Sequence, residues 1–80
     1  MEDWNKLAAN ILRAELKRRG ITYEQLHSNL ANIGINETVN SIRIKISRGS
    51  FQFAFFLQCS AAIGIKNLNL SDLIHQDLSV

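Results

Sequence analysis

Apolar residues recur at helical spacing through most of the 80-residue chain, and single glycines separate the apolar runs. The glycines lie 14 or 15 residues apart, and each follows such a run: Gly20, Gly34, Gly49 and Gly64. Glycine is common directly after a helix, because it readily adopts the left-handed conformation that ends one. The chain has no proline, no repeat and no linker-like stretch. The pattern therefore predicts one domain over residues 1–80, an all-α compact bundle of about five short helices.

The first predicted helix covers about residues 3–19. Acidic residues precede it and three cations end it, which complements the helix dipole. Its single apolar stripe consists of Trp4, Leu7, Ala8, Ile11, Leu12 and Leu16.

The second predicted helix begins at a capping box, in which Thr22 is the N-cap and Gln25 reaches back to the Thr22 amide. Ile21 and Leu26 occupy the positions of a hydrophobic staple. We expect Gly34 to end the helix and its buried stripe to be Leu26, Leu30 and Ile33.

The third predicted helix covers about residues 36–48, with Asn36 as its N-cap. Its apolar stripe is Val39, Ile42 and Ile46. The opposite face carries Glu37, Asn40, Ser41, Ile44, Ser47 and Arg48, with Arg43 and Lys45 on the flanks.

The fourth predicted helix, about residues 50–63, is apolar nearly all round and must be buried on most sides. Residues 65–70 alternate apolar and polar, which indicates an extended connector or a short strand. Ser71 is placed to cap a final helix over about residues 72–78.

Composition narrows the class of protein. The apolar fraction of 46% suits a compact core, and the acidic start of the chain argues against a signal peptide. No apolar run approaches the roughly 20 residues that a membrane span needs, so no membrane partner is expected. The single cysteine, Cys59, excludes a disulfide framework and points to a reducing cytoplasm.

Nothing in the chain assembles an active site, so we expect neither an enzyme nor a cofactor or metal site. His27 and His75 lie far apart and lack metal-ligand partners at helical spacing. Cys59 lies in the most apolar helix, where it is expected to be a core thiol, and His27 is expected at the surface.

The distribution of charge is uneven, although the net charge is only +2. Residues 4–48 contain eight basic and three acidic residues, whereas residues 49–80 contain one basic and two acidic residues. A basic half joined to an apolar half suggests one face for a polyanion and another for packing. Ordinary solvation of surface helices is an equally good account of the charge alone.

The polar face of the third helix has the side chains that a major-groove helix needs. Asn40, Ser41 and Ser47 can exchange hydrogen bonds with base edges, and asparagine suits adenine. Arg43 and Arg48 can reach guanine or phosphate, and Lys45 can pair with phosphate. Ile44 is apolar on an outward face, so it touches a thymine methyl group, meets a partner protein or is a stray surface residue.

The order of the elements strengthens this interpretation. Residues 12–73 resemble the five-helix Cro/repressor-type (lambda repressor-like) DNA-binding domain, which contains a helix-turn-helix. Residues 21–26 resemble its entry to the supporting helix. The stretch from residues 35–39 to residues 47–49 resembles its recognition helix and the turn that follows. Residues 62–65 with 70–73 resemble its C-terminal packing unit. The helix spacings are longer than usual, and His27 stands where the pattern usually has a small residue.

Residues 12–23, 45–51 and 55–59 more closely resemble a bacterial family of small helix-turn-helix-like domains, domain of unknown function 6471. The resemblance covers nearly the whole chain and implies the helix-turn-helix fold. The tight corner at Gly34-Ile35-Asn36 fits such a turn.

The resulting hypothesis is a sequence-specific DNA-binding transcriptional regulator, with double-stranded DNA as partner and a homodimer as the assembly. The third helix lies in the major groove, and the start of the second meets phosphates. The expected DNA-binding residues are Thr22, Tyr23, Gln25, Glu37, Asn40, Ser41, Arg43, Ile44, Lys45, Ser47 and Arg48. The alternative is a protein-binding adaptor, antitoxin-like or a phage inhibitor protein, on the same scaffold.

Overall fold

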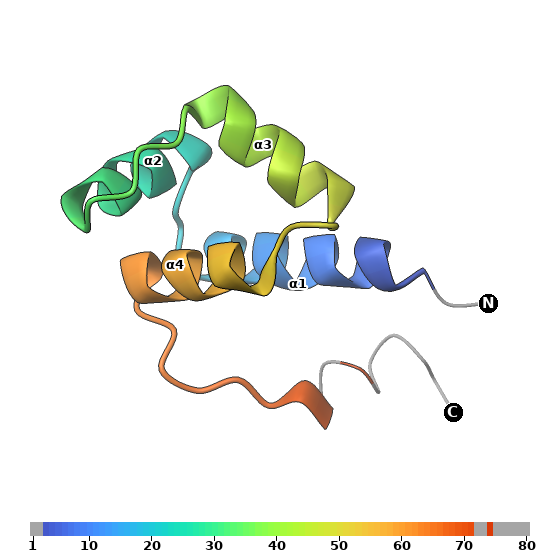
Figure 1. The fold of residues 1–80 in the computed structure, drawn as a ribbon. Coiled ribbons are helices and arrows are strands. Elements are labelled where there is room, and N and C mark those ends of the chain that lie inside the picture. The colour runs from blue at the N-terminus through green and yellow to red at the C-terminus, as the bar shows by residue number, and fades with distance from the viewer. Residues whose placement is uncertain (1–2, 72–73, 75–80) are drawn as a thin grey trace.

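The computed structural model describes residues 3–71 and 74, and within them it contains four helices and no strand. The helices are α1 (Trp4–Arg18), α2 (Tyr23–Asn32), α3 (Val39–Arg48) and α4 (Phe53–Ile63). Helices α2 and α3 lie together over a layer formed by α1 and α4, and the chain after α4 runs beneath that layer (Figure 1). The prediction of an all-α fold is confirmed.

One hydrophobic core joins all four helices. Its buried members are Leu12, Leu16, Leu26, Leu30, Ile42, Ile46, Phe55, Cys59 and Ile63. Both aliphatic residues that α3 contributes are fully buried, so α3 faces the core with one side only. Its other side is exposed.

Local capping explains where α1 and α2 begin. The Asp3 carboxylate accepts a hydrogen bond from the Lys6 amide (3.1 Å). At α2 both halves of the predicted capping box are present: the Thr22 hydroxyl accepts from the Gln25 amide (3.1 Å), and the Gln25 side chain accepts from the Thr22 amide (2.8 Å). These starts agree with the sequence prediction, because each depends on residues only three positions apart.

Several apolar positions predicted to be buried are exposed, among them Phe53 (71%) and Leu57 (51%) of α4, the helix that was wrongly expected to be buried on most sides. Trp4 is 58% exposed, because it lies in the first turn of α1, at the end of that helix farthest from α2 (Figure 1). Ile33 is 48% exposed, because α2 ends at Asn32 and Ile33 leaves the helical path as the C-cap. Ala8, Ile11 and Val39 are half-buried.

The predicted start of α3 was wrong. The helix begins at Val39, and Thr38 rather than Asn36 is its N-cap, accepting a hydrogen bond from the Ser41 amide (3.0 Å). Ile35 packs against the core. Residues 36–38 then connect it to the first turn of α3. The connection is therefore the stretch 33–38 and not a corner of three residues.

The later boundaries also differ from the prediction. Helix α4 begins at Phe53 instead of about residue 50, with Gln52 as its N-cap. Residues 65–69 have no regular structure, which agrees with an extended connector. Leu70, Ser71 and Ile74 are helical, whereas most of the final helix predicted over residues 72–78, together with His75, lies outside the described residues.

Gly49 ends α3 at a close approach to α1. It has a φ of 69°, and a Cβ atom placed on it would lie 1.7 Å from the backbone oxygen of Asn5. No side chain fits there, so only glycine allows the end of α3 to approach the first turn of α1 this closely. This contact helps to determine the direction in which α3 presents its outer side.

Candidate nucleic-acid interface

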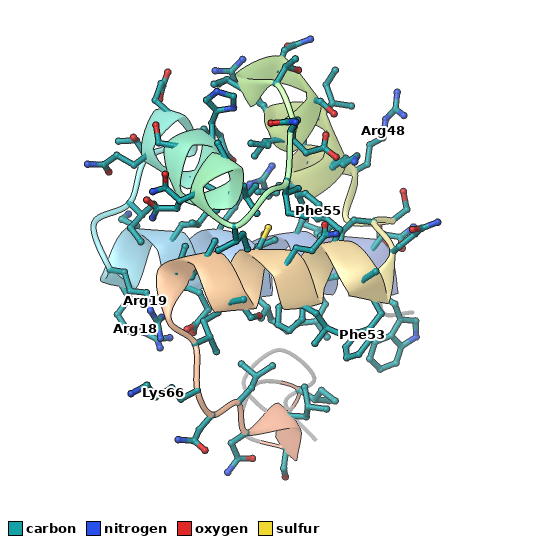
Figure 2. All side chains as sticks on the ribbon, turned by 60° about the vertical axis from the view of Figure 1, so that its left-hand side comes forward. Arg18, Arg19, Arg48, Phe53, Phe55 and Lys66 are labelled. Atoms are coloured by element: carbon teal, nitrogen blue, oxygen red, sulfur yellow. The ribbon has the colours of Figure 1, made fainter. Side chains whose placement is uncertain are left out.

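The outer side of α3 is exposed along its whole length in the described protein. On a helical projection Ile44 lies opposite the core residues Ile42 and Ile46, and Asn40 and Arg48 lie one turn to either side of it. All three of these outward residues are exposed, Ile44 by 40%. Figure 2 shows Arg48 extending away from the end of α3. The predicted outward residues Asn40, Ile44, Ser47 and Arg48 are exposed, whereas Ser41 is half-buried and Glu37 lies in the loop before α3 and is also half-buried.

Two arginines, one from α3 and one from α1, make contacts between helices on the side of α3 nearest α1. The Arg43 guanidinium lies over the ring of Tyr23, 5.8 Å from its centroid, at the start of α2. Arg13 of α1 donates a hydrogen bond to the Ser47 hydroxyl (3.2 Å). These contacts bring cations from two helices to one edge of the outward face. Sequence reasoning did not select Arg13, because nothing local in the sequence connects positions 13 and 47.

The opposite edge of α3 is neutralised by the loop before it. Glu37 accepts hydrogen bonds from the side chains of Ser41 (2.7 Å) and Lys45 (2.5 Å). These hydrogen bonds, that of Lys45 first, hold the pKa of Glu37 below its ordinary value despite partial burial. The Lys45 ammonium also lies 5.0 Å from the centroid of the Phe55 ring. Lys45, predicted to meet phosphate, therefore has an internal anion as its partner.

The loop is also attached to α2. Nδ1 of His27 lies 2.5 Å from the carbonyl oxygen of Glu37. A carbonyl oxygen only accepts, so Nδ1 is the donor in this contact. His27 is half-buried rather than a free surface residue, and it fixes the loop that positions Glu37.

The three predicted residues at the start of α2 have internal contacts. Thr22 and Gln25 hold each other in the capping box, and Tyr23 lies beneath Arg43. A groove of about 390 Å³ opens beside them, and its polar lining includes Arg13 and Lys17 of α1. Glu24 of α2 lines the same groove, so the two cations there face one carboxylate as well as the start of α2.

Ion pairing shows which cations remain for a partner. Glu15, only 3% exposed, pairs with Arg18 and Arg19, and Glu37 pairs with Lys45. In the described part of the chain no ion pair links an acid to the other basic residues of the first half, which are Lys6, Arg13, Lys17, Arg43 and Arg48. Most of the uncompensated charge thus lies on α3 and the side of α1 beside it.

The residues considered for other chemistry are placed as follows. Cys59 is fully buried in the core, and burial raises the pKa of its thiol to about 12, which confirms the predicted core thiol. Among the described residues, no three His, Cys, Asp or Glu side chains gather as a metal-binding group. None of the helices that the structure describes has the length and apolar character needed to cross a bilayer.

Comparison with known families assigns the chain. The model of the family described as domain of unknown function (DUF6471) matches residues 4–68. The chain belongs to this family. The match takes in all four helices of the DUF6471 domain and the groove between α1 and α2. No curated protein and no solved structure was found to match this chain.

Proposed function

We propose that this DUF6471 domain is a sequence-specific DNA-binding transcriptional regulator of helix-turn-helix type, in which α2 supports α3 and α3 enters the major groove. The observation that carries the proposal is the exposed outer side of α3, where Asn40 and Arg48 flank Ile44. A major-groove helix needs hydrogen-bonding side chains for base edges and cations for phosphates. Both kinds are present, and the protein's own core leaves them uncovered.

The neighbouring elements fit the phosphate contacts on either side of such a helix. Arg13 and Lys17 line the groove at the start of α2, and Arg43 lies over Tyr23 beside it. In the proposed complex these cations meet the DNA backbone on the side of α3 nearest α1. Arg48, which extends from the C-terminal end of α3 (Figure 2), contacts DNA in the same complex.

A homodimer on a palindromic site completes the proposal. A single DNA-binding module of this size buries only about 600–1,000 Å², which favours two copies for useful affinity. Phe53 and Leu57 lie on the side of α4 away from the core and are 71% and 51% exposed. These apolar side chains, together with Leu70, which is 58% exposed, are the proposed dimer contact.

Selection of bound duplexes from a random pool, followed by titration with salt, tests the proposal. The wild-type protein is expected to enrich one palindromic sequence, and the logarithm of its affinity is expected to fall linearly with the logarithm of salt concentration. Arg48→Ala should reduce that slope by about 0.9, the value for one phosphate contact.

Lys66→Ala is the matched control, because Lys66 is exposed and lies after α4 on the far side of the molecule from Arg48 (Figure 2). It removes the same charge and should leave the slope unchanged. An unchanged slope in Arg48→Ala would remove Arg48 from the interface. Failure to enrich any sequence would reject sequence-specific binding.

A protein-binding adaptor is the second candidate function, and an apolar groove favours it. The groove, about 340 Å³, is formed by α1, α4 and the segment after α4, and its described lining is entirely apolar, including Phe53, Phe56 and Leu70. Such a surface is typical of contacts between proteins. A pull-down that recovers one protein, with no shift of any DNA, would favour the adaptor.

A further inference from the structure

The centre of the outward face of α3 is formed by Asn40 and Ile44, which lie four positions apart on consecutive turns. At a rise of 1.5 Å per residue they are about 6 Å apart along the helix axis. Both are exposed. A ligand lying along α3 therefore meets an amide and a branched aliphatic side chain in succession.

The side chains around this pair have contacts within the protein. Ser41 and Lys45 donate hydrogen bonds to Glu37, and Ser47 accepts one from Arg13. The Arg43 guanidinium lies over the ring of Tyr23. Within the part of the chain that the structure describes, no hydrogen bond or ion pair is recorded for the Asn40 amide. Its two donors and its acceptor are therefore available to a partner.

Ile44 differs from the other isoleucines of α3. Ile42 and Ile46 are fully buried, whereas Ile44 is 40% exposed. Beside it a groove of about 330 Å³ is lined partly by the cations Lys45 and Arg48. Ile44 is thus an apolar contact beside the cation Arg48, whereas the charge of Lys45 is paired with Glu37 of the preceding loop.

Duplex DNA offers the matching chemistry. Its backbone is polyanionic, and thymine alone among the bases presents a methyl group in the major groove. Adenine presents a hydrogen-bond acceptor and a donor there, which an asparagine side chain contacts with two hydrogen bonds. An A·T pair therefore supplies partners for both side chains.

We propose that α3 recognises A·T pairs, with Asn40 bonded to adenine and Ile44 packed on the methyl group of thymine. This inference rests on the proposed insertion of α3 in the major groove. The two residues lie about 6 Å apart along the helix axis, and successive base pairs of duplex DNA lie about 3.4 Å apart. We therefore expect the contacted base pairs to lie within about two steps of each other. Asn40 and Ile44 are thereby assigned as specificity-determining residues.

Chemically altered duplexes test this assignment on the unmodified protein. The probe is the duplex most enriched by wild-type protein from the random pool, resynthesised with uracil in place of each thymine in turn. Uracil pairs as thymine does but lacks the methyl group. At one thymine in each half-site, the exchange for uracil should lower the affinity for the protein about fourfold, which is the contribution of one buried methyl group. An adenine within two base-pair steps of that thymine is the proposed partner of Asn40. Replacing it by 7-deazaadenine, which lacks the N7 acceptor, should weaken binding at least about fivefold.

Two variants connect each effect to its residue. Ile44→Ala should bind the thymine and uracil duplexes equally, because it lacks the side chain that contacts the methyl group. Ile33→Ala is the matched control: Ile33 is also an exposed isoleucine, but it lies at the end of α2, and its variant should keep the fourfold discrimination. Asn40→Ala should lose the discrimination against 7-deazaadenine.

The outcomes separate this inference from the proposed function. If no duplex is enriched, DNA binding itself is rejected. An enriched duplex that binds equally well with uracil at every thymine would overturn the role of Ile44 and leave the regulator intact. Discrimination that persists in Ile44→Ala would also overturn it, because another residue would then contact the methyl group.

Discussion

Gly49→Ala is the substitution for which the structure makes the sharpest prediction. The Cβ atom it adds would lie 1.7 Å from the backbone oxygen of Asn5, whereas real contacts of this kind are essentially never shorter than 3.0 Å. The shortfall, 3.0 minus 1.7, is 1.3 Å. The obstructing atom belongs to the backbone of α1, so no side chain can rotate away. The end of α3 and the start of α1 must separate.

Two costs add up in this variant. Holding alanine at a φ of 69° costs roughly 1–2 kcal/mol. Forced backbone displacement in a packed region typically costs a further 1–3 kcal/mol. We therefore expect the free energy of unfolding to fall by about 2–5 kcal/mol. For a domain of this size each kcal/mol lowers Tm by about 4–8 °C, so Tm should fall by at least about 8 °C.

Gly20→Ala separates the two costs. Gly20 has a φ of 66°, close to that of Gly49, but nothing lies within 4 Å of its added Cβ atom. It should therefore lose only the conformational part, roughly 1–2 kcal/mol. Both variants would be unfolded by heat and by urea and followed by circular dichroism. Equal losses in the two variants, within about 0.5 kcal/mol, would refute the account of the Gly49–Asn5 contact.

Two further predictions concern buried and partly buried titratable groups. Cys59, with a pKa of about 12, should resist a thiol reagent at pH 8 in the native protein and react fully in guanidinium; rapid native labelling would contradict its burial. Glu37→Gln should lower the free energy of unfolding at pH 7 by less than about 1 kcal/mol, because Lys45 is 41% exposed and solvent screens the pair. Since the folded pKa of Glu37 is lowered, the wild-type advantage is complete above the ordinary value of 4.5 and is lost as the pH falls through the folded pKa. Urea titrations of both proteins across the acid range measure this, and a wild-type advantage that does not shrink as the pH falls would exclude the carboxylate as its source.

The parts of the fold that sequence predicted well depend on neighbouring residues. The capping box at Thr22 and the left-handed glycine after α3 are local features, and they lie where the pattern placed them. The start of α3 was missed, because Asn36 and Thr38 are both good caps and the choice depends on the packing of Ile35 against the core. That contact involves residues distant in sequence, which a local pattern does not contain.

In the candidate site, too, the sequence predicted local features but not contacts between residues distant in sequence. Helical periodicity was sufficient to place Asn40 and Ile44 on the outward face. It did not reveal that Glu37 holds Lys45, or that Arg13 reaches Ser47 across 34 positions of sequence. Counting charges along the chain identified the basic half correctly but left open which cations were already neutralised.

The one-sided burial of α3 has a consequence for how such domains diversify. Its inward isoleucines hold the helix in place, whereas Asn40, Ile44 and Arg48 are exposed and outside the hydrophobic core. Exchanges at exposed positions usually change the free energy of unfolding by no more than about 0.5 kcal/mol. Under the proposed function, the same scaffold can therefore acquire a different target by substitution at these three positions, with its architecture inherited unchanged.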